Sequence, residues 1–264
     1  MKKDLKQLIY LLVSSKLAFL LAYRRLTSIF VRTKLGFFWI SISSLITSSL
    51  IFVVYSVVFK IEDSVEYFAY LVLGVAIWFG ITFPLSNFAN TFKTHKGKIL
   101  NTTLKGSFFI VEEMAYSLYN AVLITSSSLL ILVFIRPNYL VNFIKSSIYI
   151  IPLLILFLFS IGTILAYLSA RFKDFIQIVP LIIQVTFVTS PIMFPKKGLG
   201  SIAEYLLFNP IYLIFDVIRS SIITPGEFPS SIKFIPILFV ILILLSMFAI
   251  RIMRKFDSKV FYWL

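Results

Sequence analysis

Few residues of this 264-residue chain could carry acid–base, nucleophilic or metal chemistry. The sequence has no Cys, which excludes thiolate metal sites and cysteine nucleophiles. Its single His, His95, lies in a basic segment between Lys93 and Lys96, and we interpret it as a solvated or lipid-facing side chain. The sequence contains no group of residues with the spacing of a metal site or a catalytic triad, so we expect no catalytic and no metal-binding residues.

Two adjacent carboxylates, Glu112 and Glu113, lie where the third apolar segment begins. Proton-coupled pumps usually bury acidic residues inside a membrane span. At the start of a helix, by contrast, the positive end of the helix dipole stabilises an anion, and we favour this structural role. The chain also lacks the G-x-x-x-x-G-K-[ST] phosphate-binding loop, so we expect no cofactor in it and no enzymatic activity of its own.

One face of the first apolar segment carries hydroxyl groups near its start and aromatic rings near its end. Spacings of three and four place these residues on one side of a helix: Ser41, Ser44, Ser48, Phe52, Tyr55 and Phe59. Small residues of this kind let membrane helices pack closely. The alternative is a face that lines a conduit, because hydroxyls contact polar solutes and aromatic rings stack on sugar rings. The pattern alone is compatible with both interpretations.

A basic cluster precedes this segment. Its members are Arg24, Arg25, Arg32 and Lys34. Guanidinium and ammonium groups bind phosphate through charge-assisted hydrogen bonds, so the cluster is a candidate site for a phosphate headgroup. Basic residues beside a membrane span also set its orientation without binding a particular ligand, and that interpretation stays open.

The composition is that of an integral membrane protein. Hydrophobic residues make up 59% of the chain, charged residues 14%, and the mean hydropathy is +0.99. Soluble domains have about 25% charged residues, so a soluble enzyme and a disordered chain are excluded. A net charge of +14 in so apolar a chain indicates contact with anionic lipid rather than with nucleic acid.

Six largely uncharged segments are long enough to cross a bilayer as helices, which takes about 20 residues. The predicted spans are 35–59, 67–92, 112–135, 146–170, 175–195 and 233–252. Between the last two, residues 199–223 are too apolar for a solvated loop. A break at Asn209–Pro210 predicts two short re-entrant helices there. We therefore expect an all-α integral membrane protein with one transmembrane domain, residues 1–264.

The distribution of Lys and Arg predicts the orientation of these spans. Eighteen of the 25 basic residues fall in 1–34, 93–107, 171–174 and 251–264, and seven fall in 60–66, 136–145 and 196–233. The positive-inside rule then places both termini in the cytoplasm. Residues 1–34 have an apolar and a basic face, with Lys16 as an exception on the apolar side, which is typical of an amphipathic helix lying in the inner membrane interface. The alternative is a basic anchor that only fixes the orientation of the chain.

Five short segments, in chain order, carry a family resemblance. They are LGFFW at 35–39, YFAYLVLGVAIWF at 67–79, SARFKD at 169–174 followed by Gln184 and Ser190-Pro191-Ile192, Asn209-Pro210 with Arg219, and RKFDSKVFYWL at 254–264. Together they resemble the permease subunit of type-2 ABC exporters, in particular those that export O-antigen and capsular polysaccharide. Teichoic-acid exporters are close relatives. The chain departs from the family's pattern at Lys105-Gly106-Ser107, where a Pro–Arg pair is common.

The resemblance implies a multi-pass protein of the bacterial cytoplasmic (inner) membrane, working as a homodimer with two ABC ATPase subunits that bind ATP and Mg. The implied substrate is an undecaprenyl-pyrophosphate-linked polysaccharide. The conduit would lie between the two permeases, built chiefly from the first, second and fifth spans, which adds Phe187 and Phe194 to its lining. The basic loop containing the coupling helix supplies the residues that would contact the ATPase: Lys93, His95, Lys96, Lys98 and Lys105.

Three other functions remain open. A drug or small-lipid exporter of the same superfamily would share this architecture. An ion-coupled carrier would need acidic residues within its spans. A non-transporting membrane scaffold would not need hydroxyl and aromatic residues on one helix face.

Overall fold

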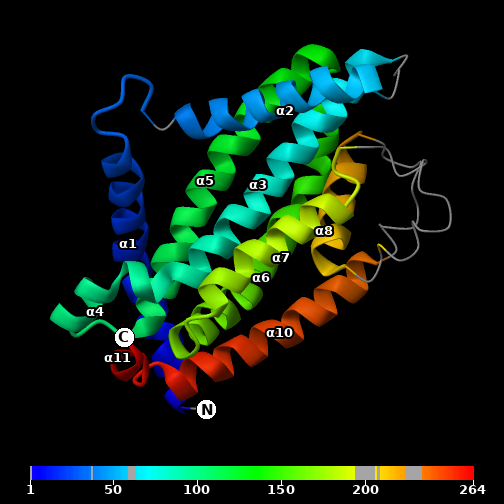
Figure 1. Ribbon diagram of the computed structural model, residues 1–264. Helices are drawn as coiled ribbons and strands as arrows, with labels where there is room; N and C mark the ends of the chain where they lie inside the picture. The colour runs from blue at the N-terminus through cyan, green and yellow to red at the C-terminus, as the bar shows by residue number, and fades with distance from the viewer. Residues whose placement is uncertain (1, 37, 59–62, 194–205, 207–208, 224–233) are drawn as a thin grey trace.

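The computed structural model describes residues 2–36, 38–58, 63–193, 206, 209–223 and 234–264 (Figure 1). Within these ranges the regular structure is helical and contains no strand. The helices are α1 (Lys2–Ile29), α2 (Phe38–Val58), α3 (Ser64–Thr94), α4 (Lys96–Asn101), α5 (Gly106–Ile135), α6 (Asn138–Arg171), α7 (Phe175–Thr189), α8 (Pro210–Ile223), α10 (Ile235–Phe256) and α11 (Val260–Trp263).

Five of these helices, α2, α3, α5, α6 and α10, are long and apolar enough to cross a membrane. Large apolar side chains face outward from them: Phe134 is 89% exposed, Ile148 80% and Val57 74%. Apolar surface on this scale is unfavourable in water and marks contact with lipid. The chain is therefore an all-helical, multi-pass membrane protein, which confirms the fold class predicted from its composition.

Four of the observed helices, α3, α5, α6 and α10, extend beyond the predicted apolar segments because polar residues also fit the ends of helices, whereas α2 lies within the predicted segment 35–59. The Asp63 side chain accepts a hydrogen bond from the backbone N–H of Glu66 at 3.0 Å, so α3 starts before the predicted position 67. Likewise, α5 begins at Gly106 rather than 112, and α6 at Asn138 rather than 146. The first four predicted spans and the last correspond to α2, α3, α5, α6 and α10.

The fifth predicted span, 175–195, is not confirmed. Helix α7 has only 15 residues, whereas a crossing takes about 20. It ends at Thr189 because Ser190 is extended, with ψ at 140°, as expected for the residue before Pro191. The described part of the chain thus contains five helices of spanning length where six were expected.

Two short helices were predicted within 199–223, and the structure describes a 14-residue helix, α8, at the position of the second. The first lies mostly outside the described residues. The side-chain oxygen of Asn209 accepts hydrogen bonds from the backbone N–H groups of Ile211 and Tyr212 at 3.1 and 3.3 Å, so Asn209 caps the start of α8. The break predicted at Asn209–Pro210 is therefore a helix start.

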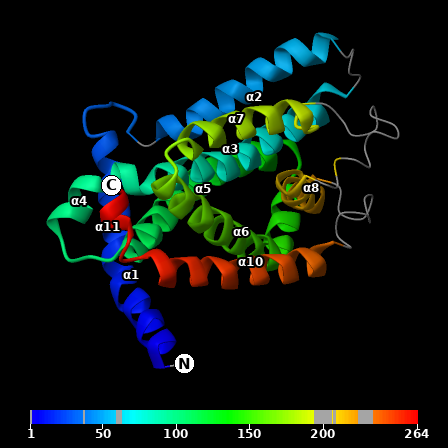
Figure 2. The same ribbon diagram turned by 60° about the horizontal axis from the view of Figure 1, so that its bottom comes forward.

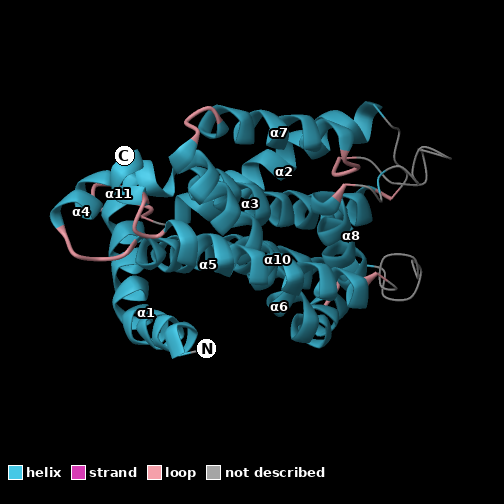
Figure 3. Cartoon of the chain, turned by 90° about the horizontal axis from the view of Figure 1, so that it is seen from below, coloured by secondary structure: helices cyan, strands magenta, loops and turns pink. Residues whose placement is uncertain are grey.

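Helix α3 forms the centre of the bundle. In two views, α2 and α7 lie on one side of it and α6 and α10 on the other (Figures 2 and 3), and α5 packs extensively against it. Gly162 of α6 permits a close approach of the two helices, because a Cβ there would lie 2.5–2.7 Å from ring atoms of Phe88. Small residues at such contacts are typical of membrane helix bundles.

Helices α1, α4 and α11 gather at one end of the bundle, named the α4 end below, while α8 lies toward the other end (Figures 1 and 2). Helix α1 packs against α5 with a face of small and apolar residues at intervals of four, namely Ala18, Ala22 and Leu26, all buried. The predicted helix within residues 1–34 is thus observed as α1, and its side chains are described from Ser15 onward.

Candidate functional site at the α4 end

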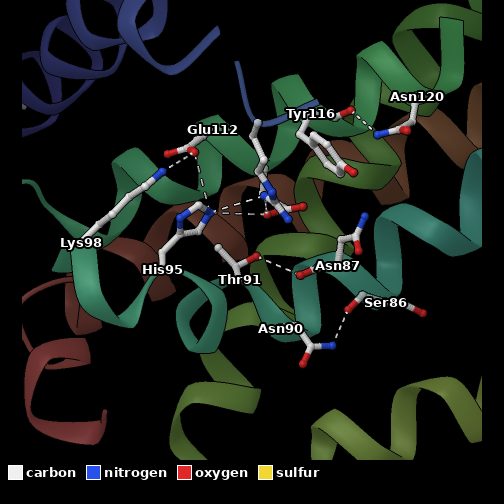
Figure 4. Close-up of polar contacts among 11 residues, drawn as sticks. Ser86, Asn87, Asn90, Thr91, His95, Lys98, Glu112, Tyr116 and Asn120 are labelled. Carbon is white, nitrogen blue, oxygen red and sulfur yellow. Dashed lines mark hydrogen bonds and ion pairs between the residues drawn. The ribbon is translucent and has the colours of Figure 1, made fainter. Parts of the chain in front are cut away.

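Five ionisable side chains from different helices meet at the α4 end. They are Arg25 of α1, His95 between α3 and α4, Lys98 of α4, and Glu112 and Glu113 of α5, and are named the α4 cluster here. Both carboxylates are fully buried, and His95 is only 2% exposed. Figure 4 shows Lys98 and His95 converging on Glu112.

Two short ion pairs hold the α4 cluster together. Arg25 Nη1 donates to Glu113 Oε2 at 2.6 Å, and Lys98 Nζ donates to Glu112 Oε1 at 3.0 Å. The His95 Nε2 atom lies between the two carboxylates, 3.9 Å from Glu112 Oε1 and 3.7 Å from Glu113 Oε2. The Arg25 guanidinium also stacks on the ring of Tyr116, 4.2 Å from its centroid, which adds a cation–π interaction.

The structure corrects two interpretations made from the sequence. Glu112 and Glu113 are not at a helix N-terminus, because α5 starts at Gly106 and its first turn contains no acidic residue. His95 is neither solvated nor lipid-facing. Its backbone N–H donates to the carbonyl of Thr91 at 3.0 Å, and its ring packs against Phe109 with centroids 5.1 Å apart. The helix bend between α3 and α4 turns this side chain inward, which a linear sequence does not reveal.

The buried carboxylates keep unused hydrogen-bonding capacity. Glu112 Oε2 and Glu113 Oε1 are buried and have no hydrogen-bond partner among the described residues. Buried charge is tolerated only when paired, and removing one partner of such a pair costs about 3–5 kcal/mol. Lys98 is 49% exposed and Arg25 21% exposed, so both cations lie at the border between the cluster and its surroundings. A displacement of α4 would separate Lys98 from Glu112, so these pairs couple α4 and α1 to α5.

A second polar contact fixes the start of α5. Asp257, just after α10, accepts hydrogen bonds from the backbone N–H of Ser107 at 2.6 Å, from its hydroxyl at 2.9 Å and from the Tyr167 hydroxyl at 3.0 Å. It thereby caps α5, whose own N-cap residue, Lys105, makes no side-chain cap bond. A Cβ at Gly106 would lie 2.8 Å from Asp257 Oδ1, so this contact requires glycine. Asp257 is 150 positions from Ser107, so no local pattern predicts this contact; the Gly106-Ser107 pair at the helix start is the one signal in the sequence.

The remaining predicted coupling residues lie on the surface of the α4 end. Lys93, Lys96 and Lys105 are exposed, and Lys96 donates to the backbone oxygen of Leu264. His95 and Lys98 instead take part in the α4 cluster. The basic segment therefore has two parts: Lys93, Lys96 and Lys105 lie on the surface, whereas His95 and Lys98 contact the buried carboxylates of α5.

The four predicted headgroup residues do not share one environment. Arg24, Arg32 and Lys34 are exposed, whereas Arg25 is turned inward to Glu113. Neighbouring helical positions point about 100° apart, which explains why Arg24 and Arg25 differ.

The predicted conduit residues of α2 lie within helix contacts of this single chain. Ser41, Ser44 and Ser48 are buried, and the Ser41 hydroxyl donates to the Leu123 carbonyl of α5 at 2.9 Å. These positions agree with the packing interpretation of the serines. The Phe52 ring contacts Phe68, with centroids 5.1 Å apart.

The other members of the predicted lining are dispersed. Tyr55 is half-buried, and Phe187 of α7 packs against Trp78 with centroids 5.4 Å apart. Phe59 and Phe194 lie outside the described residues. A conduit between two copies of the chain stays a prediction about the assembly.

A second buried charge site, the α8 cluster of Tyr70, Asp216 and Arg219, lies toward the other end. Arg219 Nη1 donates to the Pro191 carbonyl at 2.9 Å, its Nη2 lies 3.6 Å from Asp216 Oδ1, and its guanidinium stacks 4.1 Å from the Tyr70 ring centroid. Burial, reinforced by the charge of Asp216, raises the pKa of the neighbouring Tyr212 phenol, which therefore stays protonated.

No protein-family model matches this chain, and a search of curated proteins finds no match to it.

Proposed function

We propose that the chain is the membrane-spanning subunit of an ATP-driven exporter of lipid-linked polysaccharide. It would act as a homodimer with two ATPase subunits, which hold the ATP and Mg. The observation that carries the proposal is α4, a six-residue basic helix that is exposed on one side and tied by Lys98 to the buried Glu112 on the other. A helix placed in this way can receive a push from a partner and transmit it to α5.

The proposed arrangement in the membrane follows from the charges. The basic α4 end would face the cytoplasm, with α1 lying in the interface. Helix α7, continued by residues after Thr189, would complete a sixth crossing, and α8 would be one of two re-entrant helices. The membrane would be the bacterial cytoplasmic membrane, where polysaccharides linked to undecaprenyl pyrophosphate are available.

Closure of the ATPases would displace α4, and the Lys98–Glu112 and Arg25–Glu113 pairs would carry that movement into α5 and α1. Arg24, Arg32 and Lys34, which are exposed, would bind the anionic pyrophosphate. Movement of α2 away from α5 would expose its serines to the polymer. The aromatic residues after them would guide the sugars, while the lipid tails stay in the bilayer.

Charge reversal tests the docking step. In K96E/K98E, co-purification of an ATPase subunit from native membranes should fall about tenfold or more, since each reversed charge costs on the order of 1 kcal/mol. The matched control is K145E, because Lys145 is exposed near the start of α6, at the opposite end of that helix from the α4 end. If the ATPase co-purifies equally with all variants, α4 is not the docking element.

A proton-coupled carrier is the second candidate, and one observation favours it. Glu112 and Glu113 lie inside a helix of spanning length, fully buried, each with an unpartnered oxygen. Buried acidic residues with this freedom are typical of proton pathways. Reconstituted vesicles separate the two functions: transport driven by a pH gradient without ATP supports the carrier, whereas transport that needs ATP and the ATPase supports the exporter.

A further inference from the structure

A cavity of about 410 Å³ opens at the α4 end, and no residue of the α4 cluster lines it. The end of α3, the α6–α7 junction and α11 form its walls, and Phe92, Ile176 and Trp263 make much of its lining apolar. This volume lies toward the lower end of the range for ligand pockets, about 300–1,000 Å³. It fits a headgroup rather than a whole lipid.

The cavity is positively charged. Lys93 and Lys173 line it and are exposed, and Lys96 also lines it while donating to the oxygen of Leu264. Arg171 lies nearby, with its guanidinium 5.4 Å from the Trp263 ring centroid. No Asp or Glu is among the described residues that line the cavity, and the oxygen of Leu264, which also lines it, is already paired with Lys96. An anionic group would therefore be attracted into it.

A buried hydroxyl in the cavity wall has no hydrogen-bond partner among the described residues. Ser169 is 3% exposed, lines the cavity, and its Oγ makes no hydrogen bond to any described residue. Some buried serines donate to a carbonyl one turn earlier, as Ser146 does to Asn142 at 2.6 Å and Ser246 to Leu242 at 2.7 Å. Ser44 and Ser117, like Ser169, make no hydrogen bond to a described residue, but neither of them lines this cavity. An unsatisfied buried donor calls for an acceptor, and a phosphate oxygen provides one.

We propose that this cavity binds the phosphate of an anionic lipid headgroup. Lys93 and Lys173 donate to the phosphate oxygens, the Ser169 hydroxyl donates to a third, and the acyl chains leave along the apolar wall into the bilayer. Lys93 lies in the last turn of α3, and Lys173 lies two residues after the end of α6. Both helices are of spanning length, so their ends would lie near the level of the lipid phosphates. The site goes beyond the proposed export function and is separate from Arg24, Arg32 and Lys34.

The experiment measures binding of short-chain phosphatidylglycerol to the full-length chain in a zwitterionic detergent. K93Q/K173Q should bind it about tenfold or more weakly, since each basic residue near a membrane surface is worth about 1 kcal/mol. S169A should bind it about fivefold more weakly without any change of charge. The charge-keeping variant K93R/K173R should bind as the parent does, which separates loss of binding from loss of folding.

The matched control is K255Q/K259Q, which removes two exposed lysines from the same end but outside the cavity. It should bind phosphatidylglycerol within about twofold of the parent. Equal losses in both double variants would mean general surface attraction and would overturn the proposal, as would unchanged binding in K93Q/K173Q and S169A together.

Inorganic pyrophosphate identifies the source of the phosphate. If it displaces the lipid, and does so less effectively in K93Q/K173Q, the cavity recognises the phosphate group whatever carries it. If pyrophosphate fails to displace the lipid while lipid binding still depends on both lysines, the lipid itself is the ligand.

Discussion

The α4 cluster and the α8 cluster both pair charged side chains inside the helical bundle, but the paired residues come from different arrangements of helices. Each contains an Arg whose guanidinium stacks on a Tyr ring, at 4.2 Å from Tyr116 for Arg25 and at 4.1 Å from Tyr70 for Arg219. In the α8 cluster, Arg219 and Asp216 are neighbours on one helix, three residues apart. In the α4 cluster, by contrast, the cations come from α1 and α4 and the carboxylates from α5.

This difference indicates different roles. Arg219 is 5% exposed and binds a backbone carbonyl, so it clamps the turn after α7 to α3 and α8. Lys98 is about half exposed and lies on α4, a separate six-residue helix. A pair within one helix stabilises, whereas a pair between separate elements can also transmit motion. The α4 cluster is therefore the better candidate for a contact that transmits movement from one helix to another.

The largest loss of stability should come from replacing Arg219 of the α8 cluster. R219L should lower the free energy of unfolding by about 3–5 kcal/mol, because Asp216 is left buried beside an apolar side chain. R25L should cost less, because Arg25 is at the border of its cluster and water can approach Glu113 through the space it leaves. Thermal or denaturant unfolding in detergent measures both. If R25L is the more destabilising variant, the stabilising role belongs to the α4 cluster rather than to the α8 cluster.

A double-mutant cycle tests whether the Lys98–Glu112 pair transmits movement from α4 to α5. K98M should lower the free energy of unfolding by about 1–3 kcal/mol. This is less than the cost of breaking a fully buried pair, because Lys98 is half exposed and water can approach Glu112 when the ammonium is removed. Adding E112Q should restore much of this loss, because the neutral amide no longer needs the ammonium. Stability and export are measured for both: K98M/E112Q should be stable yet defective in export. Full export by the stable double variant would contradict the transmitting role.

Two glycines at the α4 end give a smaller, paired comparison. G106A should destabilise the protein by about 1–2 kcal/mol, because the new methyl group collides with Asp257 Oδ1 and disturbs the cap of α5. G97A is the control: nothing lies within 4 Å of a Cβ there, and alanine favours helix by about 1 kcal/mol over glycine. G97A should thus be neutral or stabilising. Similar losses in both variants would argue against the Asp257 contact.

The smallest effect on stability is expected at Ser44 of α2. Its hydroxyl is buried and has no hydrogen-bond partner among the described residues, so S44A should change the free energy of unfolding by less than about 0.5 kcal/mol. S41A, which loses the bond to Leu123, should cost about 1 kcal/mol. Reduced export in S44A at unchanged stability supports a conduit face, whereas unchanged export supports packing alone.

Much of the architecture follows from local pattern. Five of the six predicted spans are observed because long apolar segments satisfy both requirements of a membrane helix, lipid contact and internal backbone hydrogen bonds. Span ends shifted by up to eight residues, as at α6, because Asn138 and the residues after it are helical although they are not uniformly apolar. Helix α7 proved short because Pro191 forces the preceding residue out of the helical region.

The candidate site depended on contacts that no local pattern contains. Arg25 and Glu113 are 88 positions apart, and Ser107 and Asp257 are 150 apart. The sequence assigned Glu112, Glu113 and His95 to a helix terminus and a solvated loop because composition alone cannot tell which face of a helix meets another helix. Only the packing of α1 and α4 on α5 buries these groups and pairs their charges. Hydrophobic length thus defines the membrane helices, while the polar contacts between them come from how those helices are packed.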